Sequence, residues 1–352
     1  MKKKITFITG AMGRGGAERV ISIIGKHFVQ KGWNVDIVMV LHSNVEYELP
    51  NDINIIDLSS ERGIKKGFLT TLGKIRRYIK VEKPDIVVCF MAQICLLFGL
   101  ATLGLKQRVI MSERIDPNSA KRNIIYRMLL NFFYAHANCL VLQTKRAKNY
   151  FNKKVQMNSR IIGNPVNVEC CHIENDRHRI VTAGRMTQQK NQSMLIDAFS
   201  KVQKHHQNYS LTIYGDGPLR ENLQEKIISL NLSGNVELPG NVLHLHEEMK
   251  DAEMFVLPSN FEGLSNALLE AMMMGIPVIA TNCAGCDEVI DNYCNGILIE
   301  VRNEDDLVKS IEFLIDNPEE RERMALKGQE YVQMFKVENI INQWEEAIDS
   351  CF

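Results

Sequence analysis

Residues 254–274 read MFVLPSNFEGLSNALLEAMMM, and this segment decides how the second half of the chain folds. Its first four residues, Met254–Leu257, are all apolar, which is typical of a strand buried on both faces of a sheet. Pro258 and Gly263 then interrupt the run, and an apolar helical stretch follows. A strand that passes through a short turn into a helix is the repeating unit of a parallel sheet covered by helices.

The same unit recurs along the 352 residues. Short apolar runs alternate with amphipathic helical stretches in both halves of the chain, which predicts parallel sheets with helices on both faces. The runs are Ile5–Ile8, Val35–Val40, Ile86–Phe90, Val109–Met111 and Leu140–Leu142, and then Ile180–Ala183, Leu211–Tyr214, Val236–Leu238, Met254–Leu257, Pro277–Ala280 and Ile297–Ile299. Two such sets predict an α/β fold of two Rossmann-like, doubly wound domains.

The two sets are separated at Gly163-Asn164-Pro165-Val166, where Gly and Pro interrupt periodic structure. We therefore expect an N-terminal domain over residues 1–164 and a C-terminal domain over residues 165–336. Residues 337–352 are expected to form an amphipathic helix that packs back on the N-terminal domain. Its apolar residues at helical spacing are Ile340, Ile341, Trp344 and Ile348.

The two halves carry opposite charge. Residues 1–164 contain 27 Lys and Arg against 11 Asp and Glu, whereas residues 165–352 contain 15 against 31. A basic domain attracts phosphates, anionic lipids or nucleic acid. No nucleic-acid recognition motif accompanies the basic residues, so a nucleic-acid partner is not expected.

Cysteine usage and the apolar stretches favour a cytosolic protein. The nine cysteines are an odd number and several lie in apolar runs, as reduced buried thiols do. Cys283 and Cys286 form a C-x-x-C pair, but a zinc site would need a second pair at suitable spacing. The apolar stretch Ile86–Leu105 divides into a strand-like and a helix-like part, Ile86–Phe90 and Leu96–Leu105, so a buried strand and helix are favoured over a membrane span.

A glycine-rich loop, Gly13-Arg14-Gly15-Gly16-Ala17-Glu18, follows the first predicted strand. Glycines let a ligand approach the backbone closely, and the start of the following helix presents N–H groups to an anion. The dinucleotide pattern G-x-G-x-x-G needs a glycine where Glu18 stands, which argues against an NAD enzyme. A tight turn without a ligand explains these glycines equally well.

Two cations, Arg185 and Lys190, flank the junction between a predicted strand and the next helix. Arg offers a fork of donors and Lys a mobile point charge, so together they could bracket a diphosphate. Taken alone, the pair would more simply be two solvated side chains.

Two acids, Glu262 and Glu270, follow the strand Met254–Leu257 with seven residues between them. Ligands in open α/β sheets bind at the carboxyl ends of strands, where Glu262 is expected. Glu270 lies in an apolar helical segment, and a carboxylate there needs a partner. Backbone N–H groups from Gly263 to Ala267 could receive sugar oxygens or phosphate.

Together these elements resemble the retaining glycosyltransferase family 4, whose GT-B fold has two Rossmann-like domains facing a central cleft. The resemblance covers nearly the whole chain and is most specific in the second half. The family's Glu-x7-Glu pattern matches Glu262 and Glu270. Its Gly-Arg pattern with a downstream Lys matches Arg185 and Lys190. Its early Gly-Gly pattern matches Gly15 and Gly16.

The resemblance implies that residues 1–164 bind the acceptor and that residues 165–336 bind the nucleotide sugar. It also implies a role for each matched residue. Glu262 would contact hydroxyls of the donor sugar, and Glu270 the ribose hydroxyls. Arg185 and Lys190 would neutralise the departing diphosphate in place of a divalent ion, so neither a metal nor another cofactor is expected. Further contacts to the nucleotide sugar are expected from Gly15, Gly16, Asn241, Gly263, Leu264, Ser265 and Asn266.

The Ser265-Asn266 variant and the loop Ser112–Pro117 resemble the subgroup that builds O-antigen, lipopolysaccharide or capsule repeat units on polyprenyl diphosphates. We therefore expect retaining transfer of a hexose or N-acetylhexosamine from a UDP-sugar to such an acceptor in bacterial surface polysaccharide synthesis. The enzyme would work on the cytoplasmic face of the inner membrane. Glu113 and Arg114 are assigned to the acceptor site.

A basic helix in the first half is a candidate contact for the acceptor or an anionic bilayer. Its cations Lys65, Lys66, Arg76 and Arg77 surround the apolar stripe Ile64, Phe68, Leu72, Ile75 and Ile79. An ordinary core helix with a solvated basic face fits this pattern equally well.

Other functions compete with this interpretation. A GDP-mannose-dependent mannosyltransferase would differ only in the loop near Gly240–Val242 that selects the base. A UDP-sugar epimerase of the same architecture would need acid and base groups in the cleft and would convert its substrate without an acceptor. A two-domain sugar-binding protein would show no turnover at all.

Overall fold

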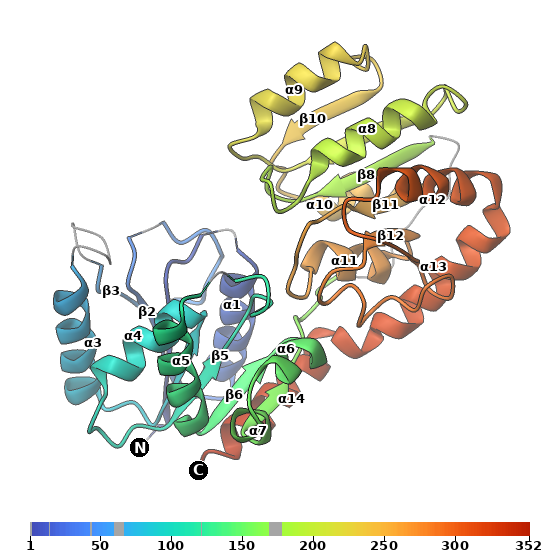
Figure 1. Ribbon diagram of the computed structural model, residues 1–352. Helices are drawn as coiled ribbons and strands as arrows, with labels where there is room; N and C mark the ends of the chain where they lie inside the picture. The colour runs from blue at the N-terminus through green and yellow to red at the C-terminus, as the bar shows by residue number, and fades with distance from the viewer. Residues whose placement is uncertain (1, 14, 43, 60–66, 121, 169–177) are drawn as a thin grey trace. The chain divides into compact units, whose positions relative to one another are not determined.

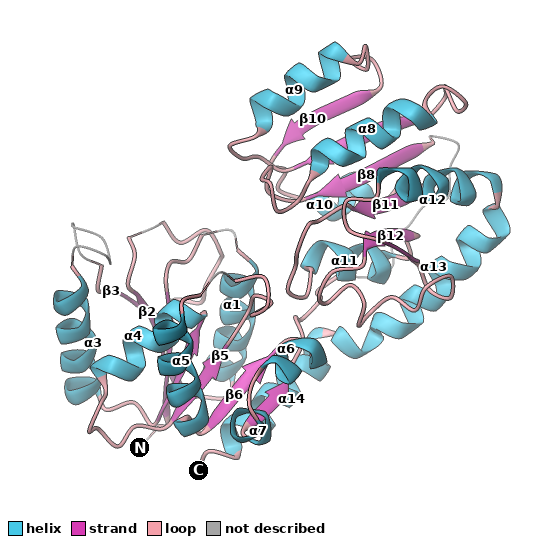
Figure 2. Cartoon of the chain, in the orientation of Figure 1, coloured by secondary structure: helices cyan, strands magenta, loops and turns pink. Residues whose placement is uncertain are grey.

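The computed structural model describes residues 2–13, 15–42, 44–59, 67–120, 122–168 and 178–352 (Figure 1). The chain divides into two compact units. Unit 1 comprises Met1–Pro165 and Val337–Phe352, and unit 2 comprises Val166–Lys336. Each unit is a parallel sheet with helices on both faces, so the α/β class with two doubly wound sheets is confirmed (Figure 2). The predicted domain boundary lies one residue before the boundary of the units.

The sheet of unit 1 has the order β3-β2-β1-β4-β5-β6-β7. Its strands are β1 (Lys4–Thr9), β2 (Asn34–Met39), β3 (Ile53–Asp57), β4 (Ile86–Phe90), β5 (Val109–Ser112), β6 (Cys139–Leu142) and β7 (Ser159–Ile161). The five internal strands coincide with the predicted apolar runs. The edge strands β3 and β7 were not predicted from the sequence, because partly exposed and polar side chains such as Asn54 and Arg160 interrupt their apolar pattern.

The helices of unit 1 are α1 (Gly16–Gln30), α3 (Phe68–Glu82), α4 (Ala92–Ala101), α5 (Ile124–His136), α6 (Lys145–Tyr150), α7 (Lys153–Met157) and α14 (Val337–Asp349). Helix α4 packs between α3 and α5 on one face of the sheet, and α1 packs with α14 on the other (Figure 1). The apolar stretch after residue 86 is thus a buried strand followed by the buried helix α4, as predicted. Among the described residues, no helix has both the length and the apolarity needed to cross a bilayer.

The C-terminal helix α14 belongs to unit 1 although it follows the whole of unit 2 in sequence. Trp344 is fully buried and stacks on Phe90 of β4, with ring centroids 5.7 Å apart. Glu345 forms ion pairs with His27 and Lys31 at the end of α1. Apolar burial, rather than these partly exposed ion pairs, supplies most of the docking energy.

The sheet of unit 2 has the order β10-β9-β8-β11-β12-β13. Its strands are β8 (Arg179–Ala183), β9 (Ser210–Tyr214), β10 (Val236–Gly240), β11 (Met254–Leu257), β12 (Val278–Thr281) and β13 (Ile297–Ile299). Its helices are α8 (Gln192–Val202), α9 (Arg220–Ser229), α10 (Leu245–Met249), α11 (Asn266–Met274), α12 (Glu304–Asp316) and α13 (Pro318–Val332), with a short 3-10 turn η1 (Gln333–Phe335). Helices α8, α9 and α12 pack together, and α11 packs with α10 and α13.

Candidate functional site

The chain of unit 2 reverses its direction across the sheet between β8 and β11. From β8 it proceeds through β9 to β10 at one edge, and it then returns to β11 on the other side of β8. The helices that follow β8 and β11 therefore leave on opposite faces of the sheet, which opens a crevice at the carboxyl ends of these two strands. Arg185 and Lys190 follow β8, and Glu262 follows β11, so the fold brings the predicted cations and the first predicted acid to this crevice.

Three hydrogen bonds connect the two loops at this crevice. The backbone N–H of Asn260 donates to the carbonyl of Gln189 at 2.7 Å, and its side-chain Nδ2 donates to the carbonyl of Gln188 at 2.6 Å. In return, Gln189 Nε2 donates to the carbonyl of Phe261 at 3.0 Å. These bonds fix the loop that carries Lys190 against the loop that carries Glu262.

Lys190 and Glu262 form an ion pair between these two loops. Lys190 Nζ lies 2.6 Å from Glu262 Oε1, and the Glu262 side chain is only 7% exposed. Ser259 Oγ donates to the same oxygen at 2.6 Å, and Thr281 Oγ1 donates to the Ser259 carbonyl at 2.5 Å. A buried carboxylate needs such partners, and here they leave Glu262 Oε2 able to accept from a ligand hydroxyl.

The N-terminus of α11 adds unsatisfied polar groups to the site. Ser265 Oγ and Asn266 Oδ1 are buried and have no hydrogen-bond partner among the described residues. Ser265 is the N-cap residue but its side chain does not cap the helix. Buried polar groups without partners cost free energy, and a helix N-terminus favours anions and polar oxygens. A sugar hydroxyl could donate to Asn266 Oδ1 and accept from Ser265 Oγ, and a phosphate oxygen could accept from Ser265 Oγ.

Gly263 is held close to a second loop. Gly285 has a φ of 85°, and a Cβ at this position would overlap the carbonyl group of Gly263. Only glycine therefore lets the loop after β12 approach the loop after β11 this closely. The neighbouring Leu264 is buried and packs into the apolar core below α11.

Glu270 lies on α11 and is 5% exposed. Its Oε2 is 3.4 Å from His246 Nε2 on α10, close enough for an ion pair but without hydrogen-bond geometry. Sequence reasoning predicted that this acid needs a partner, but it did not identify His246. His246 follows a loop and has no regular spacing to other possible ligand residues, so the sequence does not indicate its contact with Glu270.

Two predicted residues of unit 2 lie at the surface. The side chain of Arg185 is exposed at the carboxyl end of β8, and Asn241 is exposed directly after β10. Glu262 and Lys190 are in direct contact, whereas Glu270 pairs with His246. An exposed cation at the crevice can still reach a ligand, because its long stem is mobile.

The C-x-x-C pair lies next to this site as two thiols. Cys283 Sγ and Cys286 Sγ are 3.6 Å apart and buried. The hydrogen bond from Cys286 lowers the pKa of Cys283 and raises that of Cys286. Within the described part of the chain, no group of three or more His, Cys, Asp or Glu side chains is arranged to hold a metal ion.

The glycine loop of unit 1 ends at the start of α1. Gly15 is the N-cap residue, Gly16 begins the helix, and the Tyr47 hydroxyl donates to the Gly15 carbonyl at 2.9 Å. A Cβ on Gly15 would overlap the carboxylate of Glu18, which folds back over the first turn. A side chain at position 15 would therefore displace the Glu18 carboxylate from this position.

Glu113 and Arg114 follow β5 and are both buried, but their surroundings differ. Glu113 Oε2 lies 2.8 Å from Arg122 Nη2 and accepts a hydrogen bond from Tyr134 at 3.1 Å. Among the described residues, Arg114 donates to two neutral groups, Asn164 Oδ1 and, at 3.5 Å, Ser112 Oγ. Burial lowers the pKa of Arg114 to about 9, because no carboxylate compensates its charge.

The basic helix α3 uses its apolar stripe to pack into unit 1. Ile75 and Ile79 are buried, so the core-packing interpretation of this helix holds for them. Arg76 Nη1 donates to the carbonyls of Ala101 and Leu103, at 2.8 and 2.9 Å, and so caps the end of α4. Arg77 is exposed. Lys65, Lys66 and Ile64 lie outside the described residues.

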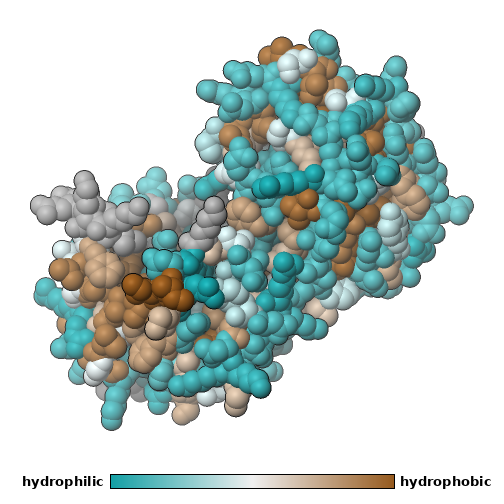
Figure 3. Space-filling view, in the orientation of Figure 1, coloured by the Kyte–Doolittle hydropathy of each residue, from teal (hydrophilic) through white to brown (hydrophobic). Residues whose placement is uncertain are grey.

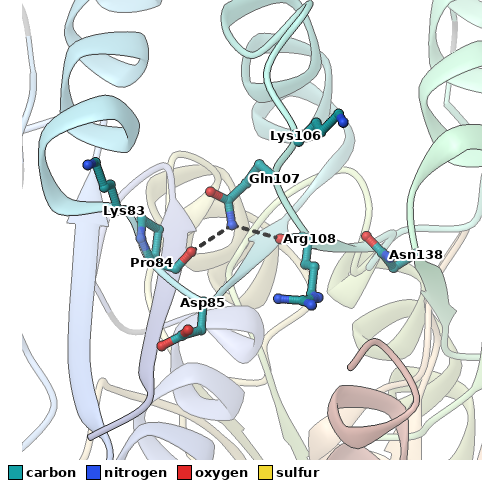
Figure 4. Close-up of a pocket in the computed structure, with 7 residues that line it drawn as sticks. All are labelled: Lys83, Pro84, Asp85, Lys106, Gln107, Arg108 and Asn138. Atoms are coloured by element: carbon teal, nitrogen blue, oxygen red, sulfur yellow. Dashed lines mark hydrogen bonds between the residues drawn. The ribbon is translucent and has the colours of Figure 1, made fainter. Parts of the chain in front are cut away.

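A polar hollow occurs at the opposite, amino-terminal edge of the unit 1 sheet (Figure 4). Gln107 Nε2 crosses it and donates to the carbonyls of Pro84 and Arg108, at 2.9 and 3.2 Å. The hollow precedes β4, β5 and β6, whereas ligands of parallel sheets bind beyond the carboxyl ends of strands. We therefore do not include it in the candidate site. Its lining residues are Lys83, Pro84, Asp85, Lys106, Gln107, Arg108 and Asn138.

Sequence reasoning also missed Ser259, which stands three residues before Glu262 and binds its carboxylate. A serine that follows a buried strand and precedes an acid is a signal that could have indicated this contact. Thr281 could not have been found, because it reaches the site from β12 through the sheet.

Comparison with known proteins identifies the family. Residues 14–169 match the family model described as Glycosyltransferase Family 4, and residues 172–331 match the model described as Glycosyl transferases group 1. The chain belongs to glycosyltransferase family 4. It is a glycosyltransferase with two Rossmann-like domains, and neither matched model describes an epimerase or a non-catalytic binding protein.

This family 4 glycosyltransferase has relatives of the same length. It is 25% identical to an uncharacterized glycosyltransferase of Haemophilus influenzae, over 98% of this chain and 99% of the relative. It is also 25% identical to a Campylobacter jejuni enzyme, over 98% of both chains. That enzyme is named GalNAc-alpha-(1->4)-GalNAc-alpha-(1->3)-diNAcBac-PP-undecaprenol alpha-1,4-N-acetyl-D-galactosaminyltransferase.

The fold of this family 4 glycosyltransferase is similar to that of HepE from Anabaena, whose crystal structure contains UDP. The TM-score is 0.82 at 16% sequence identity, with 99% of this chain and 100% of HepE covered. At this identity the similarity shows the GT-B fold.

Proposed function

We propose that this enzyme transfers a hexose or N-acetylhexosamine from a UDP-sugar, with retention at the anomeric carbon, to a glycan carried on polyprenyl diphosphate. The reaction would serve the synthesis of a bacterial surface polysaccharide. The observation that carries the proposal is the Lys190–Glu262 ion pair at the chain-reversal crevice of unit 2. A cation and a hydroxyl-binding carboxylate at one strand end suit a sugar diphosphate.

On the donor side, Arg185 and Lys190 would neutralise the charge that develops on the diphosphate as the sugar leaves. The reaction would then need no metal ion. Glu262, oriented by Lys190 and Ser259, would accept a hydrogen bond from a donor-sugar hydroxyl through Oε2. Ser265 Oγ and the backbone N–H groups at the start of α11 would donate to sugar or phosphate oxygens, and Asn266 Oδ1 would accept from a sugar hydroxyl.

The nucleoside would bind beside α11. Glu270 would accept the ribose hydroxyls, with His246 next to its carboxylate. Asn241, exposed after β10, would contact the base. UDP is favoured over GDP because the structurally similar HepE binds UDP, and GDP-mannose remains the alternative donor.

On the acceptor side, the buried cation Arg114 supports a diphosphate-linked substrate. Its present partners are neutral, so an anion that enters the carboxyl edge of β5 would offset the cost of burying its charge. The Campylobacter relative is named for an acceptor on undecaprenyl diphosphate. With such an acceptor, the enzyme would work at the cytoplasmic face of the inner membrane.

A nucleotide-sugar panel tests the proposal. UDP-glucose, UDP-galactose, their N-acetylamino forms and GDP-mannose are each incubated with a lipid-linked acceptor extract, with and without EDTA. We expect one UDP-sugar to give product in both conditions, with an α-linkage by NMR. Arg185→Ala should lose most turnover, whereas Arg323→Ala, an exposed arginine paired with Glu320 on α13, should keep it. Turnover of Arg185→Ala at the wild-type rate would contradict the assignment.

A further inference from the structure

Helix α5 has two apolar sides, and only one of them is covered. Leu130, Phe133 and Tyr134 are buried against unit 1. On the other side, five large apolar side chains are between 36% and 67% exposed: Ile124, Ile125, Met128, Leu129 and Phe132. Their i, i+1, i+4, i+5 and i+8 spacing places them on one continuous side of the helix, which we call the α5 face.

The rotation of α5 about its axis is fixed by its buried side. Phe133 packs on Gly99 of α4 so closely that a Cβ at Gly99 would lie 2.5 Å from the ring. The Tyr134 hydroxyl donates to Glu113, and the Asn123 side chain caps the first turn. The α5 face is therefore exposed because the other side is fully engaged, and not because the helix is loosely packed.

The sequence around the α5 face is strongly basic. Residues 117–168 contain nine cations and not one Asp or Glu. The cations are Lys121, Arg122, Arg127, Lys145, Arg146, Lys148, Lys153, Lys154 and Arg160. A continuous segment of this charge favours an anionic surface.

Cations and a further apolar side chain lie at the edges of the α5 face. The Arg127 guanidinium stands 5.3 Å from the ring of Tyr150 on α6. Lys154 Nζ on α7 is 3.5 Å from His136 Nε2 in the last turn of α5, and Met157 at the end of α7 is 89% exposed. Figure 3 shows hydrophobic side chains gathered on unit 1 in the region of α4 and α5.

We propose that the α5 face, together with Met157, docks on the surface of an anionic lipid bilayer. The inference rests on the proposed function, since an acceptor on polyprenyl diphosphate resides in a bilayer. The apolar side chains would enter the boundary between headgroups and acyl chains, while the cations at the edges would contact lipid phosphates. This surface is separate from the basic helix α3, whose Ile75 and Ile79 are buried inside unit 1.

The chemistry of the surface favours a bilayer over other occupants. With 13 residues, α5 is about 20 Å long and too short to span the hydrocarbon core, so it would lie in the plane of the interface. A second copy of the chain would bring its own Arg127 and Lys154 against those of the first, and like charges across an interface are unfavourable.

Vesicle sedimentation tests the proposal with the full chain. The variant Ile124→Gln, Ile125→Gln and Met128→Gln removes three exposed apolar side chains and keeps good helix formers. The matched control changes three exposed side chains of unit 2, Ile228→Gln, Leu243→Gln and Leu326→Gln. We expect wild type and control to bind vesicles with 30% phosphatidylglycerol, and the α5 variant to partition at least tenfold more weakly at an unchanged melting temperature.

Several outcomes would overturn the proposal: no binding of wild type to anionic vesicles at low salt, equal binding to pure phosphatidylcholine, or wild-type binding by the α5 variant. Loss of a concentration-dependent dimer in that variant would instead identify a second copy as the occupant. A reporter variant, Ile125→Trp, keeps the face apolar, and its fluorescence should shift to shorter wavelength on anionic vesicles. An unshifted spectrum would also contradict the docking.

The same variants separate this proposal from the proposed function. With a water-soluble acceptor analogue, the α5 variant should transfer sugar at the wild-type rate, whereas transfer to a vesicle-embedded acceptor should fall at least fivefold. Vesicle binding without any sugar transfer would leave the docking intact and refute the proposed function. If the α5 substitutions leave the rate of transfer to the embedded acceptor unchanged, the docking is refuted and the proposed function stands.

Discussion

Lys190 Nζ and Ser259 Oγ both lie 2.6 Å from the same oxygen, Oε1, of Glu262. Lys190 comes from the loop after β8 and Ser259 from the turn after β11, so one carboxylate oxygen joins the two strands between which the chain reverses. This arrangement fixes the direction of the carboxylate before any substrate binds. A group that is oriented in advance needs less reorganisation during the reaction.

The Lys190–Glu262 pair should behave as a coupled unit in stability. Lys190→Met leaves a nearly buried carboxylate with only the Ser259 donor, and we expect a loss of about 1–3 kcal/mol of unfolding free energy. In the background of Glu262→Gln the same substitution should cost at least about 1 kcal/mol less. Urea denaturation of the four proteins measures this, and strictly additive effects would show that the ion pair is unimportant.

Ser259→Ala should raise the activation free energy of the reaction, measured from kcat, by more than it lowers the free energy of unfolding. The variant loses one hydrogen bond, with a typical net contribution of about 0.5–1.5 kcal/mol, but Glu262 also loses one of the two groups that orient it. Ser200→Ala, which removes a hydroxyl bond to the Asp197 carbonyl on α8, is the control for stability alone. If both variants keep full kcat, Ser259 has no positioning role.

Gly285→Ala should disturb donor binding. The residue has a φ of 85°, and the new methyl group would overlap the Gly263 carbonyl, so the loop at the start of α11 must shift. Gly32→Ala is a matched control, because its φ is 80° and nothing lies within 4 Å of the added Cβ. Calorimetric titration with UDP should show weaker binding, by about tenfold or more, for Gly285→Ala only.

Arg114→Met should abolish a response to anions. Burial lowers the pKa of Arg114 from its ordinary value to about 9, so at neutral pH the folded protein bears the cost of a buried charge. We expect pyrophosphate to raise the melting temperature of wild type, with an effect that fades as the pH rises through about 9. Without pyrophosphate, the Arg114→Met variant should be at least as stable as wild type. Addition of pyrophosphate should not change its melting temperature.

Arg76→Met provides the comparison for that experiment, because Arg76 also donates only to neutral carbonyls of unit 1. It should lower stability through the lost cap of α4 while it keeps the pyrophosphate response. A pyrophosphate response that survives in Arg114→Met would show that the anion binds elsewhere.

Internal strands were predictable because their pattern is local. Runs such as Ile86–Phe90 are buried on both faces and therefore contain no polar interruption. The edge strand β3 escaped prediction, because an edge strand needs only one buried side and Asn54 and Asp57 break its apolar run. Helix α4 begins four residues earlier than the predicted Leu96, since Met91 with a φ of 73° makes a tight turn out of β4.

The candidate site was predictable in its residue types but not in its contacts. Arg185, Lys190 and Glu262 each follow a predicted strand, so their place at strand ends could be inferred from the chain order. The roles of His246 and Thr281 could not, because they approach from other elements and have no motif. The α3 stripe shows the same limit, since its sequence alone does not say whether Ile75 and Ile79 face a core or a membrane.

By itself the sequence determined the strand–turn–helix units, the two sets into which they fall, and the acids and cations at their strand ends, because these depend on patterns within a few residues. Only the tertiary structure decided that Lys190 and Glu262, 72 positions apart, share one hydrogen bond, and that the α5 face remains uncovered. Both follow from the sheet order and from which side of each helix is packed, and these result from long-range burial that no local pattern specifies.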